Sequence, residues 1–270
     1  MPQKPTAYYR PSSLDEALQL LGRPNTVPLA GGTALLATEE GISSAVVDLQ
    51  DAGLDNLTWT DGGRLLRIGA MVRLVDLEDL VTPLAEIQGA AALLKDAIHR
   101  AGPNTYRHAA TVGGVVASRL PDSELLAALL ALDATVSLRL PAPETLSLAA
   151  YLQAEELLPG LIAELLVYWP AGTGALERVA RTPDDQPIVS VIAWRPDDGA
   201  ICLAATGIGS LPRRLTAAEE AVAGGLTSQS VDEAAARAQA AADHPGDFRG
   251  DGAYRAKMAG VLTRRALSAL

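Results

Sequence analysis

Two glycine pairs, each beside a threonine, are the residues in this sequence whose types and spacing could do chemistry. One lies next to Thr33 in the stretch LAGGTALLA (29–37), and the other follows Thr111 in the stretch ATVGGVVAS (109–117). Because glycine has no Cβ, backbone at such positions can approach an anion closely and point its N–H groups at it. A threonine hydroxyl adds a further donor. Two such loops would suit a pyrophosphate, which carries two anionic groups.

A plainer interpretation of each glycine pair is a tight turn or a bulge that needs positive φ. The sequence alone gives this interpretation about the same weight as the anion cradle. In either case ATVGGVVAS is interpreted as a short β-branched strand broken by glycines, and His108 as a structural residue in the loop before it. His108 could otherwise serve as a base or as a point of flavin attachment.

Several other kinds of site are disfavoured by what the sequence lacks. There is no GxGxxG after a strand, no GxxxxGK[ST] and no GxSxG elbow, which argues against Rossmann, P-loop and serine hydrolase chemistry. Cys202 is the only cysteine, so this chain holds no disulfide and no iron–sulfur cluster of its own. The three histidines show no metal-ligand spacing. The net charge of −10 argues against nucleic acid or an anionic membrane as a partner.

The elements that must position the glycine pairs follow from local patterns. Ser13 and Glu16 form a capping box before an apolar helical face that ends at Gly22. We expect further helices and strands along the rest of the 270 residues: strands at 45–49, 65–70, 134–140, 164–170, 187–194 and 200–209, and helices at 73–80, 84–98, 122–133, 214–223, 230–242 and 251–268. Trp169 and Trp194 are expected in the core.

At the level of motifs, the chain resembles the FAD-binding medium subunit of the molybdenum hydroxylases, the carbon monoxide dehydrogenase and xanthine dehydrogenase type. LAGGTALLA is similar to the first flavin loop of that family, usually AGGTDLL, and RHAATVGGVVAS to the second, usually RNxATIGGNxA. Five further stretches follow the family's order over nearly the whole chain: YYRPSSLDEALQLL, LLALDATVSL, RTPDDQPIVSVIAW, GIGSLPRRLTAAE and GAYRAKMAGVLTRRAL.

The resemblance implies an α+β fold: a two-subdomain FAD-binding domain of the xanthine dehydrogenase/CO dehydrogenase flavoprotein type, and a smaller C-terminal α+β domain with an antiparallel sheet and helices. The expected boundaries are 1–168, with subdomains of about 1–55 and 56–168, and 169–270. In this family the backbone N–H groups of both glycine loops hold the FAD pyrophosphate. The implied cofactor-binding residues are Leu29, Ala30, Gly31, Gly32, Thr33, Ala34, Leu35, Thr111, Val112, Gly113, Gly114, Val115 and Glu124.

The function that the resemblance implies is electron transfer within a hetero-oligomer. A cytoplasmic location is expected because the sequence shows no apolar signal segment and no run able to span a bilayer. A molybdopterin-containing large subunit would oxidise the substrate, and a small subunit with [2Fe–2S] clusters would pass electrons to FAD on this chain. FAD would then deliver them to NAD, a quinone or oxygen. No residue of this chain is expected to be catalytic, and none to bind a metal.

Several polar side chains of the family pattern are replaced in this sequence. Val115 and His108 stand where the family has Asn, Glu124 and Ala34 where it has Asp, and Glu177 where a lysine is common. These departures leave open a structural or assembly subunit that binds FAD weakly or not at all. A stand-alone flavin oxidase is a further alternative, disfavoured because no substrate domain remains.

Overall fold

The computed structural model describes residues 4–37, 41–139, 142–154 and 160–270, which divide into two compact units. The first unit comprises residues 1–77, 104–118 and 135–167, and the second comprises 78–103, 119–134 and 168–270. Each unit is therefore built from segments that lie far apart in the sequence. The mixture of helices with parallel and antiparallel sheets confirms the predicted α+β class.

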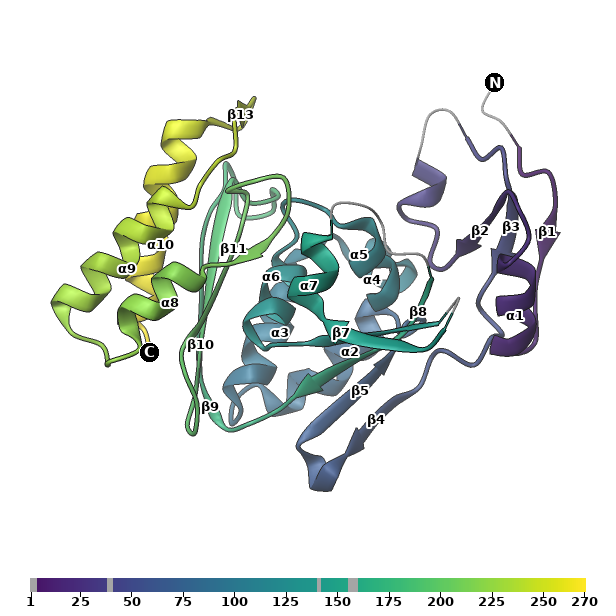
Figure 1. The fold of residues 1–270 in the computed structure, drawn as a ribbon, viewed down its shortest axis with the longest axis horizontal. Helices are drawn as coiled ribbons and strands as arrows, with labels where there is room; N and C mark the ends of the chain where they lie inside the picture. Colours follow the sequence, from purple (N-terminus) through teal and green to yellow (C-terminus); the bar gives the residue numbers. More distant parts are fainter. Residues whose placement is uncertain (1–3, 38–40, 140–141, 155–159) are drawn as a thin grey trace. The chain divides into compact units, whose positions relative to one another are not determined.

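The first unit contains a three-stranded parallel sheet in the order β1-β3-β2, visible with α1 in purple in Figure 1. As predicted, Ser13 caps α1, its hydroxyl accepting from the Glu16 N–H, and Gly22 ends it; the Glu16 carboxylate accepts from Ser12. The apolar face of α1 packs on β3 through Ala17 and Leu20. The elements are β1 (Tyr8–Tyr9), α1 (Leu14–Leu21), β2 (Thr26–Leu29), η1 (Leu35–Ala37) and β3 (Ala45–Asp48).

The same unit contains a five-stranded sheet in the order β4-β5-β8-β6-β7. Arg67 on β5 and Glu164 on β8 form a two-pronged ion pair across neighbouring strands, with N–O distances of 2.8 and 3.0 Å. The elements are β4 (Leu57–Thr60), η2 (Asp61–Gly63), β5 (Leu65–Gly69), α4 (Asn104–Ala109), α5 (Val112–Ser118), β6 (Thr135–Arg139), β7 (Glu144–Ser147), α7 (Leu148–Gln153) and β8 (Leu161–Tyr168).

The second unit is an antiparallel sheet in the order β12-β11-β10-β9, covered by helices on both faces (Figure 1). Alternate residues of β10 explain the two layers. Val189, Val191 and Ala193 pack in one apolar cluster with α8, α9 and α10. On the opposite face, Ser190 contacts α6 and Trp194 lies against the backbone of α3 at Gly89.

Where the sequence predicted an element of the second unit, its bounds agree to within a few residues, except that the helix expected from 84 begins at Gly89. The strand at 172–179 and the short strands at 213–214, 246–247 and 250–251 were not predicted. The elements of this unit are η3 (Thr82–Leu84), α3 (Gly89–Arg100), α6 (Glu124–Ala131), β9 (Gly172–Val179), β10 (Val189–Pro196), β11 (Cys202–Thr206), β12 (Arg213–Arg214), α8 (Thr216–Val222), α9 (Ser228–Ala240), β13 (Gly246–Asp247), β14 (Gly250–Asp251) and α10 (Gly252–Ser268); α2 (Leu74–Val81) crosses from one unit to the other. Trp169 and Trp194 are buried, as predicted. Among the described residues, no helix is long and apolar enough to cross a membrane.

Candidate functional site

The first glycine loop leaves the end of β2 and presents a run of free backbone donors. Leu29 is the last residue of β2, and Leu35 is the first residue of η1. Between them, the N–H groups of residues 31–34 donate to no other atom in the part of the chain that the structure describes. Gly32 has φ of +74°, and its carbonyl accepts from the Leu36 N–H at 2.9 Å. Successive free N–H groups around a left-handed glycine form a concave array that suits an anion.

The second glycine stretch is a helix and not the strand expected from its β-branched residues. Val112–Ser118 form α5, and Thr111 just before it makes an isolated bridge to Arg73. The N–H groups of Val112 and Gly113 donate to the carbonyls of Val72 and Ala70, both at 2.9 Å. These tertiary hydrogen bonds fix the first turn of the helix, so they override the low helix propensity of valine and glycine.

The backbone donors of this second stretch are therefore used within the protein. Besides the N–H groups of Val112 and Gly113, that of Gly114 donates to Thr111 Oγ1 at 3.1 Å, and that of Val115 to the Thr111 carbonyl at 2.9 Å. The Thr111 hydroxyl keeps its own hydrogen available for a further acceptor. The two glycine stretches consequently differ in what they offer a ligand.

The two stretches contact each other inside the first unit. A Cβ built on Gly31 would lie 1.9 Å from the Ala109 carbonyl oxygen, so the first loop passes directly over the end of α4. A Cβ on Gly114 would lie 3.9 Å from the Cβ of Ala30. The fold therefore joins two segments that are about 80 residues apart in the sequence, as an anion cradle made of two loops requires.

A side chain is excluded at the four glycines for different reasons, and only one of the four matches a tight turn that needs positive φ. Gly32 alone needs positive φ. Gly31 is required by the Ala109 carbonyl, and Gly113 by Ala70, whose Cβ and carbonyl oxygen would lie 2.6 and 2.8 Å from an added Cβ. Within 3.4 Å, a Cβ built on Gly114 would meet only Thr111 Oγ1, which would lie 3.0 Å away. Gly114 is thus the glycine that internal packing explains least.

Tyr106 on α4 belongs to the surroundings of the first loop, and sequence reasoning missed it. Burial raises the pKa of the Tyr106 phenol, and a hydrogen bond with the Thr33 side chain opposes that rise. Its position one residue before the RHAAT motif is the only signal that could have identified it. His108, on the same helix, is exposed, whereas Val115 on α5 is buried.

Glu124 lies in the second unit, at the first position of α6, and takes part in a buried polar cluster. Its Oε1 accepts from Arg178 Nε of β9 at 3.0 Å and from the Ser190 hydroxyl of β10. Arg178 also donates to the carbonyls of Pro183 and Asp185. Glu124 Oε2 is buried and has no hydrogen-bond partner among the described residues. The carboxylate therefore links α6 to the sheet and keeps one oxygen unsatisfied.

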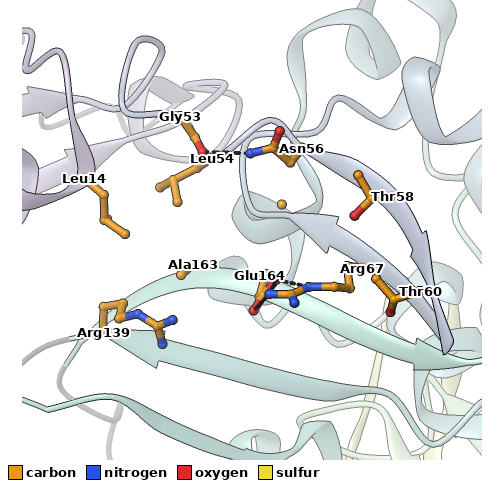
Figure 2. Close-up of a pocket in the computed structure, with 11 residues that line it drawn as sticks. Leu14, Gly53, Leu54, Asn56, Thr58, Thr60, Arg67, Arg139, Ala163 and Glu164 are labelled. Carbon is orange, nitrogen blue, oxygen red and sulfur yellow. Dashed lines mark hydrogen bonds and ion pairs between the residues drawn. The ribbon is translucent and has the colours of Figure 1, made fainter.

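A cavity of about 360 Å³ in the first unit lies apart from all the predicted residues. Figure 2 shows the Arg67–Glu164 pair on one side, Arg139 on a neighbouring strand and Leu14 of α1 opposite them. None of the thirteen residues expected to bind a cofactor lines it. The glycine stretches, and not this cavity, are consequently the candidate site.

Comparison with known families matches both parts of the chain. The family model described as "FAD binding domain in molybdopterin dehydrogenase" matches residues 4–164, and that described as "CO dehydrogenase flavoprotein C-terminal domain" matches residues 176–270. Together these matches include both glycine stretches, Glu124 and strands β10, β11 and β12 of the second unit's sheet.

Individual relatives match over nearly the whole chain. The carbon monoxide dehydrogenase medium chain of Afipia carboxidovorans is 30% identical over 282 residues, covering 96% of this chain and 94% of that protein. The protein YgfM of Escherichia coli (strain K12) is 32% identical over 258 residues, covering 94% and 92%. Among solved structures, a carbon monoxide dehydrogenase from Hydrogenophaga pseudoflava that lacks the Mo-pyranopterin moiety is 27% identical, with a TM-score of 0.88 over 100% of this chain and 98% of that chain.

Proposed function

This chain belongs to the family of FAD-binding medium subunits of molybdopterin dehydrogenases, and we propose that it carries electrons through FAD from iron–sulfur clusters on a partner chain to an external acceptor. Family membership makes this chain an FAD-binding subunit of an oxidoreductase. Bound FAD would supply the redox chemistry, and the protein would bind it, orient it and tune it.

The free N–H groups of residues 31–34 are the observation that carries the proposal. They suit the FAD pyrophosphate because they are oriented donors with no competing partner among the described residues. The loop contains no lysine or arginine, so backbone dipoles, and not cationic side chains, would offset the phosphate charge. The concave loop therefore fits a dinucleotide phosphate.

The second stretch would act in a different way. Because the N–H groups of residues 112–115 are engaged, we propose that it contributes the Thr111 hydroxyl as a donor and the bare surface of Gly114 as a place of close approach. Val112 and Gly113 would hold α5 in place on Val72 and Ala70. The resemblance implied backbone donors from both loops, and the geometry supports them for the first loop.

Glu124 is kept as a proposed cofactor-binding residue on the family resemblance alone. Its Oε1 accepts from Arg178 and Ser190, and its Oε2 is buried within the second unit. The remaining proposed residues line or flank the first loop: Leu29, Ala30, Gly31, Gly32, Thr33, Ala34 and Leu35.

We also propose that the chain works within a hetero-oligomer in the cytoplasm, with a molybdopterin-containing large chain and a small chain that holds [2Fe–2S] clusters. The single cysteine, Cys202, supports this because an iron–sulfur cluster needs several thiolate ligands, which must then come from another chain. The match to FAD-binding family models does not favour the alternative of a subunit whose flavin site has decayed.

Co-expression with the neighbouring genes tests the proposal. We expect a stable complex that contains molybdenum, iron and one FAD per copy of this chain, measured by elemental analysis and by the visible absorbance of oxidised flavin. The isolated chain should quench the fluorescence of added FAD. A chain that binds no FAD, alone or in the complex, would refute the proposal, and so would a monomer that oxidises a small substrate unaided.

A further inference from the structure

The cavity of about 360 Å³ in the first unit contains an arginine whose charge no carboxylate balances. Arg139, the last residue of β6, lines this cavity together with the Arg67–Glu164 pair (Figure 2). Arg67 is neutralised by Glu164, whereas Arg139 forms no ion pair in the part of the chain that the structure describes. No other charged residue among those described lines the cavity, so its walls carry an excess of one positive charge.

The Arg139 side chain is held in place with one edge of its guanidinium free. Its Nη1 donates to the Ser137 hydroxyl at 3.0 Å and to the Leu138 carbonyl at 3.1 Å. Both acceptors belong to the same strand as Arg139, so these bonds orient the guanidinium before a ligand binds. Within the described ranges, Nε and Nη2 donate to no atom. That edge presents two parallel N–H groups, the arrangement that binds a carboxylate through two hydrogen bonds.

The neighbouring ion pair shows this arrangement with a carboxylate of the protein itself. Arg67 Nε donates to Glu164 Oε2 at 3.0 Å, and Arg67 Nη2 donates to Glu164 Oε1 at 2.8 Å. Arg139 presents the same edge without such a partner. Figure 2 shows its guanidinium turned toward the interior of the cavity. A carboxylate that pairs with Arg139 therefore has room to come from a bound molecule.

Two further polar groups of the cavity are available to a ligand that also carries hydroxyl groups. The Thr58 hydroxyl on β4 makes no hydrogen bond with any described residue. Asn56 donates from Nδ2 to the Gly53 carbonyl at 3.2 Å, which leaves its Oδ1 able to accept. Leu14 and Leu54 add apolar surface. A carboxylate-binding edge, a hydroxyl and an amide oxygen thus share one space, as is typical of small-molecule sites.

The size and composition of the cavity restrict the ligand. Its volume of about 360 Å³ lies near the lower end of the range for small-molecule sites, which is about 300–1,000 Å³. None of its lining residues is aromatic, so it offers no stacking surface to a nucleotide base. One unbalanced positive charge suits a monocarboxylate better than a phosphate dianion. We propose that this cavity binds a small hydroxycarboxylate, whose carboxylate pairs with Arg139 and whose hydroxyl groups contact Thr58 and Asn56.

Isothermal titration calorimetry of the full chain tests this site. The probes are lactate, glycerate and gluconate, and their matched neutral analogues are propane-1,2-diol, glycerol and sorbitol, in which a hydroxymethyl group replaces the carboxylate. We expect at least one of the three hydroxycarboxylates to bind at millimolar concentration and its neutral analogue not to bind. Inorganic phosphate should bind more weakly than that hydroxycarboxylate.

Variants of the cavity identify the groups that bind the probe. Because Arg139 donates charge-assisted hydrogen bonds, Arg139→Gln should raise the dissociation constant at least about tenfold, which is about 1.4 kcal/mol. Arg139→Lys keeps the charge but not the two-pronged edge, so it should recover only part of the loss. Thr58→Val, which leaves Arg139 intact, should raise the constant about two- to twelvefold. Arg23→Gln is the matched control, since Arg23 lies over the Tyr9 ring outside the cavity in the same unit.

The outcomes also separate this site from the glycine stretches. None of the proposed cofactor-binding residues lines the cavity, so the FAD affinity of Arg139→Gln should equal that of the wild type. Failure of all three hydroxycarboxylates to bind would overturn the proposal, and so would equal binding of the neutral analogues or tighter binding of phosphate. An unchanged dissociation constant in both Arg139→Gln and Thr58→Val, or a loss equally large in Arg23→Gln, would place the probe elsewhere and overturn it too.

Discussion

Replacing Gly114 by alanine separates a role in ligand binding from a role in packing. A Cβ at this position would lie 3.0 Å from Thr111 Oγ1, so the hydroxyl must yield by a few tenths of an ångström. Alanine within a helix gains about 0.5–1 kcal/mol over glycine, which offsets that crowding. We therefore expect the free energy of unfolding of Gly114→Ala to stay within about 1 kcal/mol of the wild-type value.

The same methyl group should weaken FAD binding. If a phosphate oxygen approaches the bare Cα of Gly114, the methyl group pushes it away from its donors. A hydrogen bond to a charged group contributes about 1.5–3 kcal/mol, so the loss of one corresponds to at least about a tenfold rise in the dissociation constant. The assay is titration of free FAD with apo protein, followed by quenching of FAD fluorescence.

Gly113→Ala is the matched control because it adds the same atom one residue earlier. The added Cβ would lie 2.6 Å from the Cβ of Ala70 and 2.8 Å from the carbonyl oxygen of Ala70. Ala70 directly follows β5, so it cannot shift unless the end of that strand shifts too. Overpacking of this kind costs about 1–3 kcal/mol, so this variant should unfold at lower urea concentration than the wild type. An FAD affinity of Gly114→Ala within twofold of the wild type would refute the close approach of a phosphate at Gly114. A Gly113→Ala chain as stable as the wild type would refute the packing role of Gly113.

Three further predictions concern the neighbouring contacts and the second unit. Gly31→Ala should lower the free energy of unfolding by about 1–3 kcal/mol or more in urea titrations, because its Cβ would meet the Ala109 carbonyl oxygen at 1.9 Å; an unchanged midpoint would disprove the contact between the two stretches. Val115→Asn should tighten FAD binding about two- to twelvefold if it restores one hydrogen bond. The variant should also destabilise the apo chain, because it buries an amide at a position where Val115 is 5% exposed. A dissociation constant for FAD equal to that of the wild type would show that backbone contacts suffice. Asp247→Asn should make the free energy of unfolding depend less on pH in acid. Burial acts to raise the pKa of Asp247, but the hydrogen bonds from Arg255 and Arg249 outweigh burial and hold this pKa below its usual 3.8. The ionised Asp247 carboxylate therefore stabilises the fold fully above that pH, and this stabilisation is lost as the pH falls. Urea midpoints measured from about pH 7 to about pH 3 should therefore fall more steeply for the wild type than for the variant.

Local patterns identified most of the elements because the signals were themselves local. The Ser13 cap, the hairpin from 187 to 209 and the three C-terminal helices needed only near neighbours in the sequence. The helix α5 was missed because valine and glycine favour it poorly, and its first turn depends on carbonyls from residues 70 and 72. A tertiary hydrogen bond of this kind leaves no periodic trace in the sequence.

The candidate site was likewise predicted only in part. Family resemblance pointed to both glycine stretches, and the fold places them in contact. Sequence reasoning could not tell that Gly31 and Gly113 are required by protein backbone while Gly114 is not, because that depends on what lies opposite each Cα. It also missed the ion pair of Glu124 with Arg178, whose partner is 54 residues away.

The interleaved composition of the second unit has a consequence for synthesis on the ribosome. Residues Leu125–Ala131 of α6 are completely apolar and buried, and the strands against which α6 packs end only at Arg214. At roughly 5–20 residues per second, this helix must wait several seconds after emerging from the exit tunnel before its sheet exists. During that interval an apolar segment is exposed to solvent, so the nascent chain is expected to bind a chaperone that recognises apolar segments. The C-terminal residues from 169 onward, expressed alone, would lack α3 and α6 and expose one face of their sheet, so they should be recovered as aggregate.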